Sequence, residues 1–351
     1  MSLALIHSSV ITPLGADIDL VVQSANAGIK PFENALLFGK NGPRIKLAQI
    51  PRALAEMNDH IQAYPKGTSS FVQRFINLAT LALLELRAVI GKAELTTMVS
   101  TDAYNLKPAN LYSELLPTLL GNANISFDSR HSFLTGSGRL GLAQCLQKAE
   151  QYVEATHAPY VLIGCLDSLI EPTRLLALSR AGRLVNPESN FASRYTHSPA
   201  MGGVIPSEAM VWLIFASQYS ALPGNNHYLH LTDNITHISS GDSTHQREGM
   251  SAAFDGLNKR YGPSQALFSC ETGEPKWTRD LQSACLQHKA YIDNQCRLIK
   301  LCNWLGDVGA AAPALALAIA QRLMFPQVTI ASWDERESAN VLQFNRQTAR
   351  S

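Results

Sequence analysis

The segment 136–141, GSGRLG, has residue types that could support chemistry. It opens a stretch whose apolar residues fall at helical spacing: Leu140, Leu142, Ala143 and Leu146. Glycines at the start of a helix let a ligand or another backbone approach closely, and the free N–H groups there favour an anion. Enzymes use such a position for a nucleophile or a phosphate group, so this segment is the first candidate site.

The literal G-x-G-x-x-G pattern of this segment allows two enzyme interpretations. A dinucleotide site would need a strand directly before the pattern and an acidic residue about 20 positions later. The preceding SFDSRHSFLT is a poor strand, and Asp167 is only a loose candidate for the acid. A hydrolase elbow would need G-x-S-x-G, whereas Ser137 lies in TGSGR. A tight-turn role for Ser137 is therefore favoured over a nucleophile, and a nucleotide-binding α/β protein stays a third hypothesis.

One cysteine–histidine pair, Cys285 and His288, has the spacing of metal ligands, with Cys296 and Cys302 further along the chain. The pair also lies in a helical pattern, where residues three apart share a face for packing reasons alone. A single pair does not make a zinc site. We therefore expect no metal and no other cofactor. The segment 334–337, DERE, is expected to be a solvated turn after a buried strand.

The overall composition excludes several classes of function. With 29 Lys and Arg against 28 Asp and Glu, the 351 residues carry no basic surface for nucleic acid. Charged residues make up only 16%, which indicates extensive burial and leaves room for a subunit interface. The start MSLALIHSSV lacks the features of a secretory signal, and the apolar run Val308–Ala320 is too short to span a membrane. Six scattered cysteines without a C-x-x-C pair indicate reduced thiols, so we expect a cytoplasmic protein without a membrane span.

Alternating strand and helix patterns predict an α/β architecture with mostly parallel sheets. A unit of small-residue turn, apolar helix and buried strand occurs twice, at 135–165 and at 306–332, which suggests an internal duplication. The second helix is so apolar that it must lie between layers. The turn-forming segment 221–226 is the strongest boundary signal, and it predicts two halves, 1–220 and 227–351.

In order along the chain, six segments carry a resemblance to a known family: SVITPLG at 9–15, TGSGRLGLAQCLQKA at 135–149, YVLIGCLDSLIEPTRLLALSRAGRL at 160–184, GGVIPSEAMVWLIF at 202–215, SCETGEP at 269–275 and GDVGAAAP at 306–313. The chain resembles the β-ketoacyl synthases of the thiolase superfamily over most of its length. The resemblance implies a duplicated five-layer αβαβα thiolase-like sandwich, usually a homodimer. In the segment 202–215, Glu208 matches the glutamate of the glycine- and glutamate-containing motif that begins a strand in this family.

The resemblance also implies three catalytic positions, and each departs from the family pattern. Thr135 stands where the nucleophilic cysteine is expected, Cys270 where the first histidine is, and Asp307 where the second histidine is, or Gly306 if the turn is aligned one residue earlier. A threonine hydroxyl is a weak nucleophile without an adjacent base. An ionised aspartate would repel a substrate carboxylate or a developing enolate. The family's C-terminal glycine-rich loop is replaced by DERESAN at 334–340.

These departures lead to the hypothesis of a catalytically degenerate bacterial protein, a pseudoenzyme that binds or scaffolds a partner. It would form a homodimer or a heterodimer with a synthase-like subunit, as chain-length factors do, or serve as an adaptor in a bacterial secretion cluster. An acyl carrier protein or an effector protein is the expected partner, and neither nucleic acid nor a membrane is. The alternative is an active 3-oxoacyl-ACP synthase-type acyltransferase with a non-standard site, such as a relocated pair of Cys270 and Asp307. A retained apolar tunnel would favour the chain-length role, and a filled cavity with an exposed apolar patch would favour the adaptor.

Overall fold

The computed structural model describes residues 3–37, 42–57, 59–91, 93–106, 111–185, 202–220, 227–239, 249–257, 262–289, 292, 295–335 and 338–348. The boundary signal at 221–226 lies outside the described residues, as do residues 186–201.

The described strands form one ten-stranded sheet and a separate two-stranded hairpin. Along the large sheet the order is β10 (Arg297–Lys300), β9 (Ala266–Ser269), β11 (Gln327–Trp333), β12 (Ala339–Thr348), β8 (His227–His237), β1 (Ala4–Ile11), β7 (Glu208–Ala216), β6 (Tyr160–Ser168), β4 (Thr96–Ser100) and β5 (Phe133–Thr135). The hairpin pairs β2 (Glu33–Leu36) with β3 (Arg44–Leu47). A short antiparallel ladder between β1 and β8, pairing Ala4 with His230 and Leu5 with Leu229, joins the two halves of the sheet.

The two halves of the sheet repeat one topology. The order β5-β4-β6-β7-β1 in the first half corresponds to β10-β9-β11-β12-β8 in the second. In each half the first two neighbouring pairs are parallel and the last two are antiparallel. The duplication suggested by the repeated turn, helix and strand is therefore confirmed at the level of strand order and direction.

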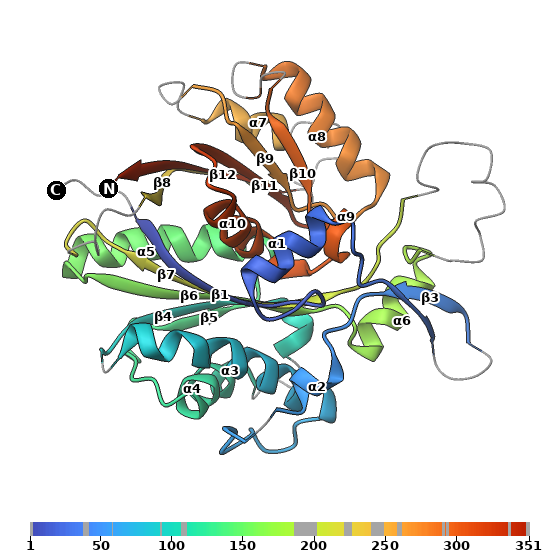
Figure 1. Ribbon diagram of the computed structural model, residues 1–351, viewed down its shortest axis with the longest axis vertical. Helices are drawn as coiled ribbons and strands as arrows, with labels where there is room; N and C mark the ends of the chain where they lie inside the picture. The colour runs from blue at the N-terminus through green and yellow to red at the C-terminus, as the bar shows by residue number, and fades with distance from the viewer. Residues whose placement is uncertain are drawn as a thin grey trace.

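Helices and half-sheets alternate in five layers (Figure 1). The outer helices are α3 (Ser70–Ile90) and α4 (Leu111–Asn122) on the first half, and α7 (Gly249–Asp255) and α8 (Pro275–Gln287) on the second. The central layer holds α1 (Ile18–Asn26), α5 (Gly141–Thr156) and α10 (Ala312–Leu323). Short helices α2 (Arg52–Ala55), α6 (Pro172–Arg180) and α9 (Cys302–Leu305) lie in connections. The predicted αβαβα sandwich is confirmed.

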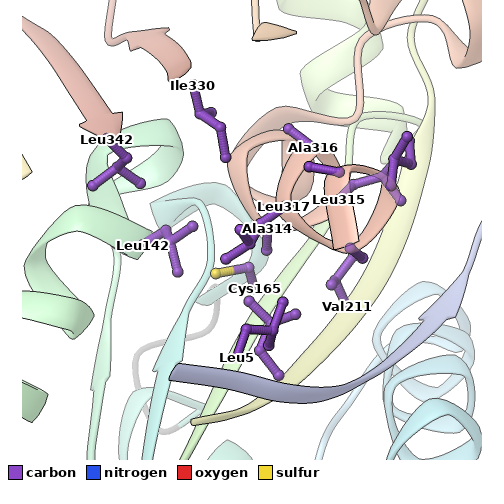
Figure 2. Packing of buried hydrophobic residues seen from close by; sticks show 14 of the residues in the cluster. Leu5, Leu142, Cys165, Val211, Ala314, Leu315, Ala316, Leu317, Ile330 and Leu342 are labelled. Atoms are coloured by element: carbon purple, nitrogen blue, oxygen red, sulfur yellow. The ribbon is translucent and has the colours of Figure 1, made fainter. Parts of the chain in front are cut away.

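The central layer forms the main core because α10 is apolar on every side. Its residues from 312 to 320 are all buried, and most are alanine or leucine. Figure 2 shows four of them, from Ala314 to Leu317, between Leu5 and Val211 of the first half and Ile330 and Leu342 of the second. Fully burying each leucine stabilises the fold by about 1.5–3 kcal/mol, and the alanines let both half-sheets pack close to the helix.

The connection 31–66 contains the β2–β3 hairpin and α2, and α7 is the part of the segment 248–261 that the structure describes as helical. The segment before the candidate site, which the sequence marks as a poor strand, contains β5, and upstream of it Phe127 forms one bridge with Leu95. The strand β12 was not expected. No helix of the described residues is long and apolar enough to cross a membrane.

Candidate functional site

Two helix starts meet in the centre of the molecule. After β5, Ser137 precedes a helical turn over Gly138–Leu140, which leads into α5. In the second half, a turn over Gly309–Ala311 leads into α10 in the same way. The two turns contact each other, because the duplicated topology places them at equivalent ends of the two half-sheets. Residues of both turns therefore define the candidate site.

The hydroxyl groups at the start of α5 bond to one another and to an amide. The Oγ1 of Thr135 lies 2.6 Å from the Oγ of Ser137, which donates to the Oε1 of Gln144 at 2.6 Å. Thr135 ends β5, whereas Ser137 is the residue that directly precedes the helical turn. An amide oxygen is too weak a base to take the hydroxyl proton. Neither hydroxyl is therefore activated by these contacts.

A buried ion pair joins the two helix starts. The guanidinium of Arg139 donates to the Asp307 carboxylate, which also accepts the N–H of Gly309 at 2.9 Å. The two side chains are only 9% and 3% exposed. Burial lowers the pKa of Arg139, but the adjacent Asp307 carboxylate outweighs burial, so the net shift is upward and the guanidinium stays charged.

Arg139 is a site residue that the motifs of the sequence do not identify, because the G-x-G-x-x-G pattern is defined by its glycines. The signal that the sequence does contain is one cation in a small-residue turn and one carboxylate, Asp307, in the equivalent turn of the other half.

The backbone of Asp307 is fixed by the chain segment 203–207. Its N–H donates to the carbonyl of Ile205 at 2.8 Å, and its carbonyl accepts the N–H of Ser207 at 2.9 Å. The preceding Gly306 has φ +76°, and a Cβ there would lie 2.6 Å from the Ile205 carbonyl oxygen. Only glycine fits this approach without strain. The carboxylate is therefore presented to Arg139 from a rigid turn.

Cys270 lies in the turn after β9 and is 1% exposed. Burial raises the pKa of its thiol, the charge of Arg139 opposes this shift, and the charges of Asp307 and Glu271 reinforce it. The net shift is upward, so the thiol stays protonated at neutral pH. The structure thus brings Cys270 and Asp307 under the influence of Arg139, whereas Thr135 contacts Ser137 and Gln144 instead.

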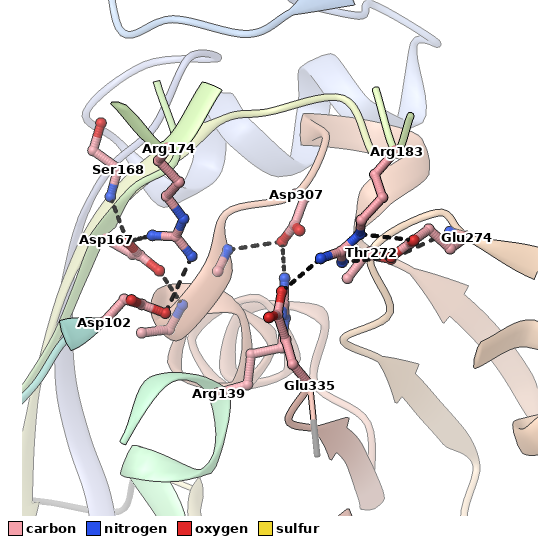
Figure 3. A network of polar contacts seen from close by, with 12 residues as sticks. Asp102, Arg139, Asp167, Ser168, Arg174, Arg183, Thr272, Glu274, Asp307 and Glu335 are labelled. Atoms are coloured by element: carbon pink, nitrogen blue, oxygen red, sulfur yellow. Dashed lines mark hydrogen bonds and ion pairs between the residues drawn. The ribbon is translucent and has the colours of Figure 1, made fainter. Parts of the chain in front are cut away.

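Asp167 accepts a hydrogen bond from the turn that leads into α10 (Figure 3). Its carboxylate accepts the N–H of Ala310 at 2.6 Å, the amide of Asn105 at 2.7 Å and the guanidinium of Arg174 at 3.0 Å. Burial raises the pKa of Asp167, and Arg174 opposes that shift. These partners occupy the carboxylate, so its suggested role as the acid of a dinucleotide site is not supported.

Glu208 ties three segments of the first half together. It is fully buried and accepts two hydrogen bonds from Arg74, at 2.5 and 2.6 Å. It also accepts the N–H of Ile50 at 2.7 Å and the hydroxyl of Ser168 at 2.8 Å. A buried carboxylate with this many donors is a structural element.

Arg183 links loops from both halves beside the site (Figure 3). It donates to Glu274 at 3.0 and 2.8 Å and to Glu335 at 2.8 Å. Burial disfavours ionisation of both glutamates, but hydrogen bonds from Arg183 outweigh it and lower the pKa of each. Glu335 was expected to lie in a solvated turn. It remains 69% exposed, yet it takes part in this ion-pair cluster.

The pair Cys285 and His288 lies on the outer layer, away from the helix starts. The Nε2 of His288 is 2.9 Å from the Oγ of Ser251, and its Nδ1 is 3.7 Å from the carboxylate of Asp255. The second distance exceeds a hydrogen bond, and Asp255 is 76% exposed, so the three residues do not form a proton relay. The described residues contain no group of three or more His, Cys, Asp or Glu side chains that could hold a metal ion.

Two surface cavities lie elsewhere on the molecule. One, of about 900 Å³, is lined mainly by the connection 49–56 and the first turns of α3. The other, of about 360 Å³, follows β10. Neither is lined by Thr135, Cys270 or Asp307.

The chain matches no protein-family model and no curated protein sequence. Solved structures do match it over almost its whole length. The ishigamide ketosynthase/chain length factor aligns with a TM-score of 0.66 and 14% identity, covering 98% of this chain and 99% of the other. An oxazolomycin ketosynthase domain of Streptomyces albus gives 0.71 and 10%, covering 100% and 76%. A chain from a complex of a type II polyketide synthase acyl-carrier protein with its ketosynthase gives 0.62 and 12%, covering 98% and 99%.

These similarities, together with the layers and the repeated topology, show the thiolase-like β-ketoacyl synthase fold. At 10–14% identity they show the fold alone.

Proposed function

We propose that this protein is a catalytically inactive β-ketoacyl-synthase-like protein that acts as a binding or scaffold partner. The observation that carries the proposal is the buried pair of Arg139 and Asp307 between the two helix starts. Condensation needs a reactive nucleophile and free hydrogen-bond donors directed at the developing negative charge. Asp307 takes up the charge of Arg139, so that cation is not available to stabilise an enolate.

The other candidate groups support the same proposal. Ser137 and Thr135 bond to each other and to the Gln144 amide rather than to a base. The Cys270 thiol is buried and protonated, so it lacks the thiolate character that nucleophilic attack requires. The positive charge of Arg139 does act on Cys270, and this is the feature that favours the alternative, an acyltransferase with a relocated Cys270–Asp307 site.

The kind of partner is proposed from the solved structures that share the fold and from the ion pair between Arg139 and Asp307. The ketosynthase/chain length factor neighbour supports a subunit that pairs with a synthase-like chain or with a second copy, and the acyl-carrier-protein complex supports a carrier protein as partner. The buried ion pair between the helix starts supports an adaptor role in a bacterial secretion cluster instead, because an acyl chain favours apolar surroundings over a charged pair. We place the protein in the cytoplasm and divide it into halves 1–220 and 227–351.

A turnover assay tests the loss of condensation. The full chain is incubated with acyl and malonyl thioesters of coenzyme A and of acyl carrier protein, and carbon dioxide release and 3-oxoacyl products are measured. We expect neither above the level of a protein-free control. Product formation that Cys270→Ala abolishes would overturn the proposal in favour of the relocated acyltransferase.

A further inference from the structure

The two ends of the ten-stranded sheet differ in how their outer backbone groups are satisfied. At β5, Thr135 directs its carbonyl to Thr101 of the neighbouring segment, so the adjacent Leu134 directs its carbonyl outward. That carbonyl accepts the hydroxyl of Tyr112 at 2.8 Å. The first end of the sheet is thus partly closed by a side chain of its own chain.

The other end, β10, presents its outer backbone groups to a groove. The N–H of Arg297 donates to Gln265 at 2.9 Å and that of Leu301 to Ser269 at 3.2 Å, both on the β9 side. Because strand residues alternate, Leu298 and Lys300 direct their N–H and C=O groups away from β9. Exposed strand edges of this kind are templates for pairing with another chain.

The groove of about 360 Å³ runs along this edge. It is lined by Arg297, Leu298, Ile299, Lys300, Asn303 and Trp304. Leu298 is 45% exposed, and Trp304 is half-buried against the central core. An apolar side chain and an indole beside open backbone groups are typical of the anchor positions of protein interfaces.

The charges that line the groove have one sign. Its charged residues are Arg297 and Lys300, without a carboxylate. Lys300 is partly compensated, since its ammonium lies 2.9 Å from Glu271 and donates to Thr278 at 3.0 Å. Arg297 is exposed and has no ion pair with a described residue. The groove therefore suits a negatively charged occupant.

We propose that β10 binds an extended acidic segment of a protein partner, which adds to the sheet as a further strand. The segment hydrogen-bonds Leu298 and Lys300 through its backbone, places an apolar side chain against Trp304 and a carboxylate against Arg297. The inference rests on the proposed role as a partner-binding protein, and it names the surface and the kind of partner.

Peptide selection tests the proposal directly. A displayed library of seven-residue peptides is selected on the purified full chain, and the enriched peptides are measured by fluorescence polarisation. We expect enrichment of acidic peptides without proline. Leu298→Pro removes the outward N–H but no bond to β9, so it should weaken binding at least tenfold, whereas Leu298→Val keeps that N–H and should bind like the wild type. Arg297→Glu should weaken acidic peptides about tenfold, and Arg130→Glu, an exposed cation in the other half, should not.

Amide hydrogen exchange of the wild type with a bound peptide locates the binding surface without any variant, so the test does not depend on how Leu298→Pro folds. The selected peptide should slow exchange in the segment 297–301 more than elsewhere. Peptides that bind Leu298→Pro as tightly as the wild type, or that leave this segment unprotected, would overturn the proposal. Self-association that Leu298→Pro abolishes would also overturn it, because the occupant would be a second copy. None of these outcomes depends on condensation activity, so this test and that of the proposed function fail separately.

Discussion

Replacing Asp307 by asparagine removes one charge from the central ion pair and keeps an oxygen that can accept the Gly309 N–H. Arg139 then remains as a charged group that is 9% exposed and has lost its ion-pair partner. Breaking a buried pair by removing one partner destabilises a protein by about 3–5 kcal/mol. We expect Asp307→Asn to lower the free energy of unfolding by this amount, and Arg139→Met, which keeps the apolar stem, to have a similar effect.

The double variant Arg139→Met/Asp307→Asn separates the ion pair from other effects of the two substitutions. It leaves no uncompensated charge, so its loss should be well below the sum of the two single losses. The coupling between the residues should be at least about 1.5 kcal/mol, within the range found for directly contacting groups. Urea unfolding followed by both far-ultraviolet circular dichroism and tryptophan fluorescence measures the three values, provided that the two signals agree.

An exposed pair supplies the control. Arg52 and Glu56 also form an ion pair, but their side chains are 88% and 60% exposed. Arg52→Met should therefore change stability by less than about 0.5 kcal/mol. The reasoning is refuted if the Arg139 and Asp307 losses add within about 0.5 kcal/mol, or if either is as small as the control.

Three further predictions follow from residues around the site. Hydrogen bonds from Arg183 lower the pKa of Glu274 and Glu335. The stabilisation of the folded protein by these two ionised carboxylates is therefore fully present above pH about 4.5 and is lost as the pH falls through their lowered pKa values. The stability difference between wild type and Arg183→Gln, measured by urea midpoints, should thus shrink between about pH 5 and pH 3, and a constant difference would contradict this. Cys270, buried and with a raised pKa, should react with iodoacetamide at pH 8 at least about 100-fold more slowly in the native protein than in urea, as peptide mapping would show; equal rates would contradict its burial. Gly306→Ala should destabilise the protein by about 1–3 kcal/mol because of its positive φ and the Ile205 carbonyl, and a thermally neutral variant would rule out that strain.

The fold was predictable where the signal is local. The apolar stretch 308–320 and the strand at 160–165 identify themselves by continuous hydrophobicity, and their repetition pointed to the duplication. The strand β12 gave no such signal, since Asn340, Gln343 and Asn345 interrupt its apolar residues, yet it pairs with both β8 and β11. Its formation depends on neighbours that are distant in sequence.

The site was predictable only in part. The resemblance pointed to Cys270 and Asp307, and in the structure both lie close enough to Arg139 to feel its charge. Arg139 itself was missed because its partner Asp307 is 168 positions away and only the duplicated topology brings the two turns together. A contact of this range leaves no periodic pattern in the sequence.

Intact-mass spectrometry after incubation with acyl-coenzyme A and acyl-carrier-protein thioesters tests the absence of a working nucleophile most directly. We predict that the full chain keeps its unmodified mass, because the hydroxyls of Thr135 and Ser137 have no base and the Cys270 thiol is buried and protonated. A covalent acyl adduct that peptide mapping assigns to any of these three residues would contradict the account.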